Sequence, residues 1–260
     1  MKIHVLGTGS AMVTKCYNTC FTIENNGEHF LVDGGGGNGI FNQLGKASIA
    51  LKDIKNIFIS HAHTDHILGV LWVVRALAQE IWHGIISHQI NIYASESVQK
   101  VLKTLCEMML NKGLFPYLEK LNFITIDEDK IYEISGMKVN FFNTQAKGDT
   151  QHGFILNENL LVFAGDKPLV ESNYDLARNC TWLLHESFSL DCNREVAHKK
   201  FHSTAKDAAE IAAAVGTKNL ILWHTEDRDL INRQTKYTDE AKQFFNGTTL
   251  VPNDLDVIVL

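Results

Sequence analysis

Residues 60–69 read SHAHTDHILG, a short stretch that holds three histidines and one aspartate. The apolar run just before it, 57–59, predicts a strand that ends where the polar residues begin. Because side chains alternate along an extended segment, His61 and His63 point the same way. A turn after them brings Asp65 and His66 to an adjacent position. Imidazole and carboxylate groups suit zinc, manganese or iron, so the stretch predicts one loop that serves two neighbouring metal ions.

Two other strand-like runs end in residues of the same chemistry. The hairpin-like segment 153–163 is followed by Gly165-Asp166, and the run 220–223 is followed by His224. A second metal ion close to the first requires a bridging ligand, and Asp166 is the natural bridge. His224 is a natural terminal ligand. An isolated histidine is usually an ordinary core or surface residue, but burying this many polar groups without a ligand would be costly.

The chain as a whole predicts an α/β fold in one domain, residues 1–260. It has 260 residues, 45% of them hydrophobic, and no Pro-rich or Gly/Ser-rich linker divides it. Short strand-like runs occur in both halves, with helical patterns between them at 66–79, 97–110 and 204–215. This order predicts two packed sheets with helices outside.

Net charge, cysteine content and apolar stretches indicate which substrates and which cellular compartment to expect. The formal net charge is −6, which provides no large basic surface for nucleic acid, so we expect a small molecule or a short polymer end as substrate. The five cysteines are odd in number and scattered, which favours reduced thiols and a cytoplasmic protein. The start lacks a signal-peptide pattern, and the most apolar stretch, 67–78, is too short to span a bilayer.

The HxHxDH stretch, the Gly-Asp strand end and the later strand end at His224 together resemble the metallo-β-lactamase superfamily. The resemblance covers nearly the whole chain, from GTGS at 7–10 to VPNDL at 251–255. It implies an αββα sandwich of two mixed β-sheets with helices on the outer faces and a dinuclear metal site along one edge. HESF at 185–188 and HST at 202–204 resemble the ribonuclease Z-like, phosphodiesterase branch.

The resemblance also implies a set of metal ligands. These are His61 and His63 at the first metal, Asp65, His66 and His224 at the second, and Asp166 as the bridge. The family has a third histidine at the first metal, at about the place that Gln145 occupies here. His152 is the nearby histidine, and we expect it to be the third ligand, with Gln145 or an open coordination position as the alternatives.

A hydrolytic reaction follows from this ligand set. Two metals about 3.5 to 4 Å apart lower the pKa of a bridging water and clamp the oxygens of a phosphoryl group. In this interpretation Asp65 orients the attacking hydroxide, and His202, backed by Glu186, donates a proton to the leaving alkoxide. The alternative for Glu186 and His202 is an N-cap salt link without a catalytic part. Asn18 and Asp33 are interpreted as residues that orient the ligand loops.

Three departures from ribonuclease Z separate this chain from a simple member of that branch. The family's early Pro-x-Lys-x-Arg-Asn loop is VTKCYN at 13–18, without the proline and arginine. No long arm separates His152 from Asp166, whereas bacterial members of the family have one there. The chain is also acidic, whereas binding of a folded RNA depends largely on phosphate contacts from Lys and Arg. We therefore expect a phosphodiesterase that acts on a small or nucleotide-derived diester, using two divalent ions, zinc or manganese, with iron as an alternative.

Other functions stay open from the sequence. The first alternative is a tRNA 3′ endonuclease, and the second is ester, thioester or lactone hydrolysis, because the same hydroxide can attack a carbonyl. A third is a non-catalytic module that binds metal or nucleic acid. The apolar segment 81–117 is a candidate wall over the site or a candidate homodimer face, beside its ordinary interpretation as helix packing.

Overall fold

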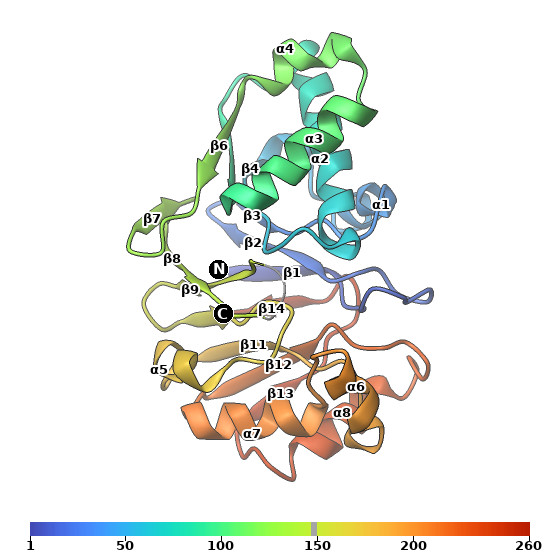
Figure 1. Ribbon diagram of the computed structural model, residues 1–260, viewed down its shortest axis with the longest axis vertical. Coiled ribbons are helices and arrows are strands. Elements are labelled where there is room, and N and C mark those ends of the chain that lie inside the picture. The colour runs from blue at the N-terminus through green and yellow to red at the C-terminus, as the bar shows by residue number, and fades with distance from the viewer. Residues whose placement is uncertain (147–149) are drawn as a thin grey trace.

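Two β-sheets form the centre of the molecule, and helices lie outside both of them (Figure 1). The computed structural model describes residues 1–146 and 150–260. The first sheet contains, in spatial order, β14 (Val257–Val259), β1 (Lys2–Gly7), β2 (Cys20–Asn25), β3 (Glu28–Val32), β4 (Ile54–Phe58), β5 (Ile90–Ala94) and β6 (Leu121–Thr125). The second contains β13 (Thr248–Leu250), β12 (Asn219–Trp223), β11 (Trp182–Glu186), β10 (Leu161–Phe163), β9 (His152–Leu156), β8 (Met137–Asn143) and β7 (Ile131–Ile134).

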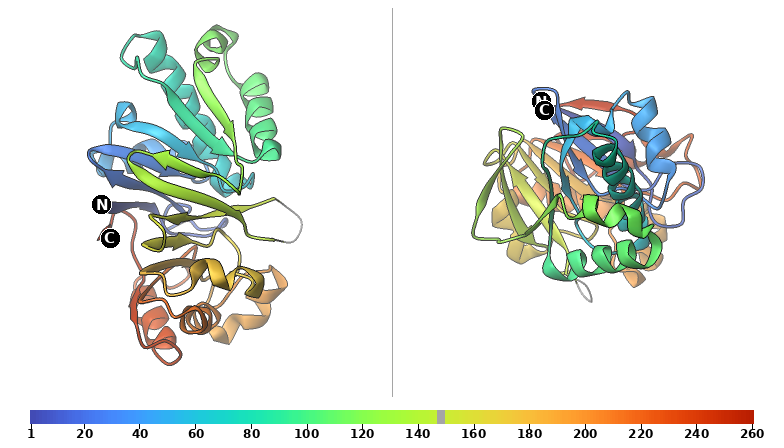
Figure 2. Two further views of the ribbon diagram at one scale, coloured as in Figure 1. Left: turned by 90° about the vertical axis from the view of Figure 1, so that its left-hand side faces the viewer. Right: turned by 90° about the horizontal axis from the view of Figure 1, so that it is seen from above.

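The helices divide between the two sheets, as the left view in Figure 2 shows. On the side of the first sheet lie α1 (Gly39–Lys46), α2 (Thr64–Trp82), α3 (Glu96–Met109) and α4 (Phe115–Leu118). On the side of the second lie α5 (Tyr174–Ala177), α6 (Arg194–Lys199), α7 (Ala205–Val215) and α8 (Arg233–Ala241). Short 3₁₀ turns at Leu51–Asp53, Lys112–Leu114, Glu171–Asn173 and Asp191–Asn193 complete the regular structure that the described residues form.

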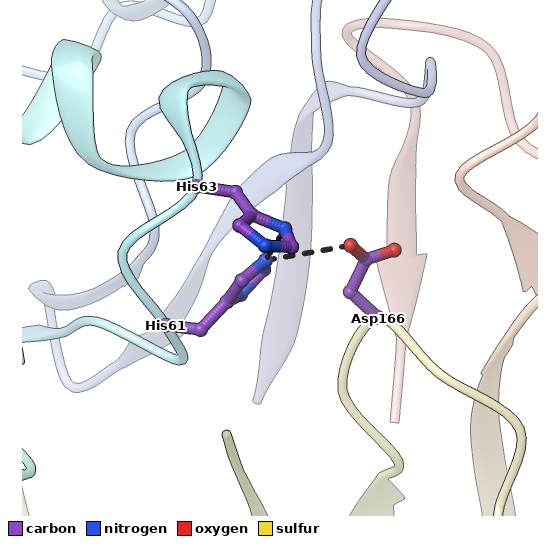
Figure 3. A group of neighbouring side chains, drawn as sticks. All are labelled: His61, His63 and Asp166. Atoms are coloured by element: carbon purple, nitrogen blue, oxygen red, sulfur yellow. Dashed lines mark hydrogen bonds and ion pairs between the residues drawn. The ribbon is translucent and has the colours of Figure 1, made fainter. Parts of the chain in front are cut away.

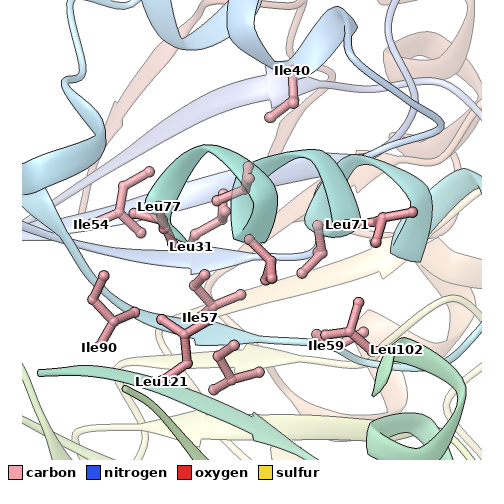
Figure 4. Packing of buried hydrophobic residues seen from close by; sticks show 14 of the residues in the cluster. Leu31, Ile40, Ile54, Ile57, Ile59, Leu71, Leu77, Ile90, Leu102 and Leu121 are labelled. Carbon is pink, nitrogen blue, oxygen red and sulfur yellow. The ribbon is translucent and has the colours of Figure 1, made fainter. Parts of the chain in front are cut away.

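Three apolar layers hold these elements together. The middle layer lies between the sheets and joins Phe21 of β2 to Phe163 of β10 and Trp223 of β12. One outer layer packs α2 on the first sheet through residues such as Leu31 and Leu77 (Figure 4). The other packs α7 and α8 on the second sheet. Burial on both faces of each sheet confirms the predicted αββα sandwich with helices on its outer faces.

Both sheets are mixed, and their parallel parts position the site. Strands β3 to β6 pair in parallel, as do β10 to β13, whereas the remaining neighbours are antiparallel. The carboxyl ends of parallel strands meet at one edge of a sheet, which is where ligands bind in open α/β sheets. The loops that follow β4, β10 and β12 carry His61, Asp166 and His224 to that edge.

Local signals predicted three of the helices closely, whereas α1, α4, α5, α6 and α8 were not predicted. The patterns at 66–79 and 97–110 correspond to α2 and α3, and the pattern at 204–215 corresponds to α7. Helix α7 has a complete capping box, in which Thr204 and Asp207 satisfy each other's backbone N–H groups, and it ends at Gly216 in the left-handed conformation. In the described part of the chain, no helix combines the length and apolarity needed to cross a membrane.

Candidate metal centre

Strand β4 and helix α2 present the HxHxDH stretch at the sheet edge. β4 ends at Phe58, and His63 keeps an extended backbone (φ −70°, ψ 152°) immediately before the first helical residue, Thr64. Asp65 therefore lies in the first turn of α2, and His66 follows it. The chain changes from extended to helical within this short segment. His61 and His63 can therefore point to one metal position while Asp65 and His66 point to the neighbouring one.

Close backbone contact fixes the start of α2. Gly34 donates its N–H to the carbonyl of His66 at 2.9 Å, and Gly69 donates its N–H to the carbonyl of Gly35 at 2.8 Å. A Cβ on Gly69 would lie 1.7 Å from the carbonyl oxygen of Gly34. Only glycine permits this approach, which brings the first turn of α2 against the end of β3.

Asp33, the residue after β3, orients the ligand loop. Its Oδ1 accepts the N–H of Ser60 at 2.8 Å, and its Oδ2 accepts the Ser60 hydroxyl at 2.7 Å. The same Oδ2 lies 2.8 Å from Nδ1 of His66. A carboxylate at Nδ1 holds that nitrogen as the donor and leaves Nε2 of His66 facing the centre of the site. This contact agrees with the predicted orienting role of Asp33.

Asp166 joins the histidines that come from different elements. Its Oδ2 lies 3.5 Å from Nε2 of His61 and 3.5 Å from Nε2 of His66, and its Oδ1 lies 2.8 Å from Nε2 of His224. Figure 3 shows Asp166 facing the ring of His61, with His63 beside it. The ring nitrogens of His61 and His63 are 2.9 Å apart. Histidines from the β4–α2 loop and from the end of β12 thus converge on one carboxylate.

Three overlapping groups of side chains have the geometry of metal sites, with their ligand atoms within 4.8 Å of one another. They are His61, His63 and Asp166; Asp65, His66 and His224; and Asp166, His202 and His224. Three buried atoms here, Nε2 of His66, Oδ1 of Asp166 and Nδ1 of His202, make no hydrogen bond of good geometry with the described residues, despite near neighbours. Buried polar atoms without partners are costly, and divalent ions would satisfy them, so the residues fit a metal.

Burial and neighbouring charges shift the pKa values of the candidate ligands. Although burial lowers the pKa of His66, its contacts with Asp33, Asp166 and Asp65 raise it well above the ordinary value. Burial and the neighbouring His66 lower the pKa of His61 to about 4, so its imidazole is neutral at physiological pH and free to coordinate. Although burial opposes ionisation of Asp166, the contacts with His224, His61 and His66 hold its pKa well below the ordinary value. Burial likewise opposes ionisation of Asp65, but His66 and His224 lower its pKa.

Glu186 and His202 lie at the same edge, next to Asp166. The fully buried Glu186 accepts the N–H of Ser203 on Oε1 at 2.5 Å, and its Oε2 lies 3.3 Å from Nδ1 of His202. Nδ1 of His202 is 4.0 Å from Oδ1 of Asp166, and its ring stacks on that of His224 at 5.3 Å. The contact between Glu186 and Ser203 fixes the start of α7, which suits the N-cap interpretation of this pair. The nearness of Glu186 to His202 suits the catalytic interpretation.

Comparison with known proteins decides the family. The model of the Anti-Pycsar protein Apyc1 family matches residues 1–247. This chain belongs to the Apyc1 family. It is also similar over its full length to two curated ribonucleases Z. The one from Lactobacillus helveticus is 25% identical, covering 99% of this chain and 97% of that protein. The one from Methanothermobacter thermautotrophicus is 26% identical, covering 100% and 97%.

Solved structures share the fold of this Apyc1-family chain. The metallo-β-lactamase fold protein YhfI from Bacillus subtilis superimposes with a TM-score of 0.79 at 18% identity, covering 99% of this chain and 98% of that chain. The short form of human tRNase Z gives 0.77 at 21% identity, covering 100% and 99%. The sequence-based recognition is confirmed: this Apyc1-family chain is a ribonuclease Z-like, metal-dependent hydrolase of the metallo-β-lactamase superfamily.

A cavity of about 370 Å³ opens over the metal centre of this Apyc1-family member. Its lining includes His63, Asp65, Asp166, His202 and His224 from the centre itself. Three cationic residues, Lys167, Lys200 and Arg228, also line it, together with the carboxylates of Glu226 and Asp227. Arg228 pairs with Glu226 at 3.0 Å, so the positive charges of Lys167 and Lys200 are the ones that favour an anionic substrate.

Asp227 holds the loop at residues 13–18 of this Apyc1-family chain in place beside the cavity. Oδ2 of Asp227 accepts the N–H groups of Thr14 and Lys15, both at 2.6 Å. The ammonium of Lys15 donates to the carbonyl of Arg228 at 3.1 Å. Lys15 therefore links the early loop to the segment that contains Arg228. Sequence reasoning missed Asp227, for which only its position shortly after His224 was a signal.

The third ligand expected at the first metal of this family member stays a prediction. The buried Nδ1 of His152 has no hydrogen-bond partner among the described residues. Nε2 of His152 lies 3.1 Å from Oε1 of Glu128, and His152 is absent from the metal-type groups. The side chain of Gln145 bonds Ser172 and Asn173 instead.

Gln151, the residue before His152, contacts a candidate ligand of the first metal site. Its Nε2 lies 3.1 Å from Nδ1 of His61, and its Oε1 accepts the hydroxyl of Thr144 at 3.2 Å. Successive side chains on an extended segment point to opposite sides, so Gln151 reaches the site when His152 points away. His61, His63 and Asp166 remain the candidate ligands of the first site.

The segment 81–117, a predicted wall or dimer face, contributes no residue to the cavity over the metal centre of this Apyc1-family chain. It holds the end of α2, then β5, α3 and α4. Several of its large apolar side chains are exposed, among them Trp82, Ile85, Met108 and Met109. The homodimer face stays a prediction, which these exposed side chains suit.

Proposed function

We propose that this hydrolase is a phosphodiesterase that acts on a small or nucleotide-derived diester with two divalent ions, zinc or manganese, with iron as the alternative. The observation that carries the proposal is the place of Asp166. Its carboxylate contacts His61 of one ligand group and both His66 and His224 of the other. A shared carboxylate between two such groups is what a dinuclear site requires.

The chain's own residues supply the remaining steps of the proposed reaction. When bound, two divalent ions activate a water and polarise the phosphoryl group. Asp65, ionised through its contacts with His66 and His224, orients the attacking water. Oε2 of Glu186 lies 3.3 Å from Nδ1 of His202, and the imidazole of His202 delivers a proton to the leaving alkoxide. Lys167 and Lys200 attract the anionic diester into the cavity.

The charge of the cavity favours a phosphodiester over a neutral ester, thioester or lactone. A neutral carbonyl substrate gains little from the ammonium groups of Lys167 and Lys200, whereas a diester carries a negative charge. The comparisons confirm the expectation of an enzyme, so we do not propose a non-catalytic module. Cleavage of tRNA at its 3′ end is the second candidate, favoured by the full-length similarity to two ribonucleases Z.

The first test is hydrolysis of a chromogenic phosphodiester with added manganese or zinc. We expect a metal-dependent rate that Asp166→Ala lowers by about a thousandfold or more. Asp175→Ala is the matched control, because Asp175 lies on the surface in α5. A positive result leads to cyclic mononucleotides and pre-tRNA as substrates. No metal-dependent rate, with a folded chain that binds metal, would refute the phosphodiesterase and direct the search to carbonyl substrates.

A further inference from the structure

Arg233, the first residue of helix α8, is a deeply buried cation that no role described above uses. Its side chain is 2% exposed, and it lies on the buried face of the helix with Tyr237 and Ala241. Arginine is rarely buried to this extent, because removing its charge from water is costly unless the guanidinium is well paired.

The guanidinium of Arg233 joins three separate segments of the chain. Its Nη1 donates to the hydroxyl of Thr8 at 2.9 Å and to the hydroxyl of Thr225 at 3.0 Å. Its Nη2 donates to the carbonyl of Pro252 at 2.6 Å and to Oδ1 of Asn253 at 3.1 Å. A planar group with a fixed fork of donors suits such a junction, and the single ammonium of lysine does not reproduce it.

Thr225 directly follows His224, the candidate metal ligand after β12. His224 has a φ of 55°, in the left-handed region, which residues other than glycine keep only when their surroundings impose it. The N–H of Thr225 donates to the carbonyl of Thr8 at 3.1 Å, and the N–H of Ser10 donates to the carbonyl of Thr225 at 2.9 Å. Arg233 binds the hydroxyls of Thr8 and Thr225 together, so it holds the two segments that impose this conformation on His224.

Thr19 determines which nitrogen of His224 faces the metal centre. Its hydroxyl donates its one proton to the carbonyl of Gly9 at 3.1 Å, so its oxygen accepts from Nδ1 of His224, which is also 3.1 Å away. Nε2 of His224 is then the nitrogen available to a metal ion. The orientation of the ring therefore depends on the segment from Thr8 to Thr19, which Arg233 holds in place.

The hydroxyl of Thr8 also explains how the charge of Arg233 is accommodated. It donates to Oδ1 of Asp254 at 2.8 Å, and Oδ2 of Asp254 accepts the N–H of Tyr17 at 2.6 Å. Because the one proton of Thr8 goes to Asp254, its oxygen accepts from Arg233. A buried guanidinium and a carboxylate are thus joined through one hydroxyl, which offsets part of the cost of burying them.

We propose that Arg233 is a positioning residue for the metal centre, which sets the backbone and ring orientation of His224 through Thr8 and Thr225. The start of α8 thereby contributes to metal binding without supplying a ligand. The inference concerns metal binding alone, so it stands whether or not the chain hydrolyses a phosphodiester. A buried cation without this role would only repel a divalent ion, so removing it would strengthen binding.

The test removes the guanidinium and measures each bound metal ion. Arg233→Met keeps much of the side-chain volume without the donors, and His224→Ala identifies the metal equivalent that depends on His224. Ala241→Gly is the matched control, because it loosens the same buried face of α8 and leaves Arg233 in place. Titration of the metal-free proteins with Co²⁺, followed by visible absorption and by competition with a chromogenic chelator, gives the affinities. Urea unfolding establishes that each variant is folded.

We expect Arg233→Met to weaken, by about 10- to 100-fold, the equivalent that His224→Ala abolishes, and to leave any other equivalent unchanged. Ala241→Gly should lower stability without changing either the affinities or the cobalt spectrum. Equal or tighter binding in Arg233→Met than in wild type would overturn the proposal. So would an equal loss of every equivalent in Arg233→Met and Ala241→Gly, or a His224→Ala variant that binds metal like wild type.

Thr225→Val provides a milder variant if Arg233→Met does not fold. It removes only the hydroxyl that accepts from Nη1, and we expect a fewfold weakening of the same equivalent. Unchanged affinity in folded Thr225→Val would then overturn the proposal. Where Arg233→Met does fold, the effects of the two substitutions should not add, because both break one hydrogen bond, and full additivity would overturn the route through Thr225.

The number of ions separates this inference from the proposed function. If wild type binds a single ion, the proposed dinuclear site fails, and the effects of His224→Ala and Arg233→Met on that ion still decide the role of Arg233. Weakening by both substitutions would uphold the positioning role, and weakening by His224→Ala alone would overturn it.

Discussion

Asp166 and His224 follow two different strands of the second sheet, β10 and β12, and Oδ1 of Asp166 lies 2.8 Å from Nε2 of His224. Strand β11 lies between those strands and pairs in parallel with both. The parallel arrangement places the ends of all three strands at one edge, so side chains distant in sequence meet there.

Asp33 should control metal affinity without being a ligand. Asp33→Asn keeps the size of the side chain but removes the charge that holds Nδ1 of His66. We expect metal affinity to fall about 10- to 100-fold, measured by competition with a chromogenic chelator. Asp129→Asn, on the exposed surface, is the control. Equal affinity in wild type and Asp33→Asn would show that Asp33 does not orient the ligand.

Gln151 and His152 should differ in their effect on the first metal site. Gln151→Ala removes the contact with Nδ1 of His61, and we expect weaker binding of one metal equivalent. His152→Ala removes a side chain that contacts Glu128, and we expect unchanged metal stoichiometry. Elemental analysis after dialysis against a limiting chelator measures both. Loss of one metal in His152→Ala alone would restore His152 as the third ligand.

His202 should matter most where the leaving group needs a proton. We expect His202→Ala to lower kcat by about 10²- to 10⁴-fold for a cyclic mononucleotide, which expels an alkoxide. The loss should be much smaller for a p-nitrophenyl ester, whose leaving group is stable as an anion. Steady-state kinetics on both substrates checks this. Equal losses on both would favour the N-cap interpretation of His202 and Glu186.

Gly69 should be intolerant of a side chain. Gly69→Ala puts a Cβ 1.7 Å from the carbonyl oxygen of Gly34, so the start of α2 must move. We expect unfolding free energy to fall by about 1–3 kcal/mol and metal affinity to fall with it. Gly45→Ala in α1 meets no atom within 4 Å and should stabilise by up to about 1 kcal/mol. Urea unfolding of both variants provides the comparison.

Asp207 should stabilise the fold at neutral pH but not in acid. Although burial opposes its ionisation, contacts with Thr204, His198 and Arg194 lower its pKa. A depressed folded-state pKa stabilises the fold above the unfolded value of about 3.9, and the gain disappears as pH falls through the folded value. We expect wild type to exceed Asp207→Asn by about 1 kcal/mol at pH 7, with the difference lost in strong acid.

Urea unfolding between pH 7 and acid measures this difference. Asp239→Asn, an exposed position on α8, is the control and should show no pH-dependent difference from wild type. A constant gap between wild type and Asp207→Asn at every pH would mean that the charge of Asp207 has no part in the capping box.

The sequence by itself determined the strand ends, the capped helix α7 and the HxHxDH stretch, because alternation, capping and helical periodicity act between near neighbours in the chain. Only the tertiary structure decided that Gln151 and not His152 contacts His61, and that Asp227 holds the loop at Thr14. The cavity over the metal centre likewise forms from separate segments of both halves of the chain. Such features depend on strand register and on the packing of distant segments, which no local pattern encodes.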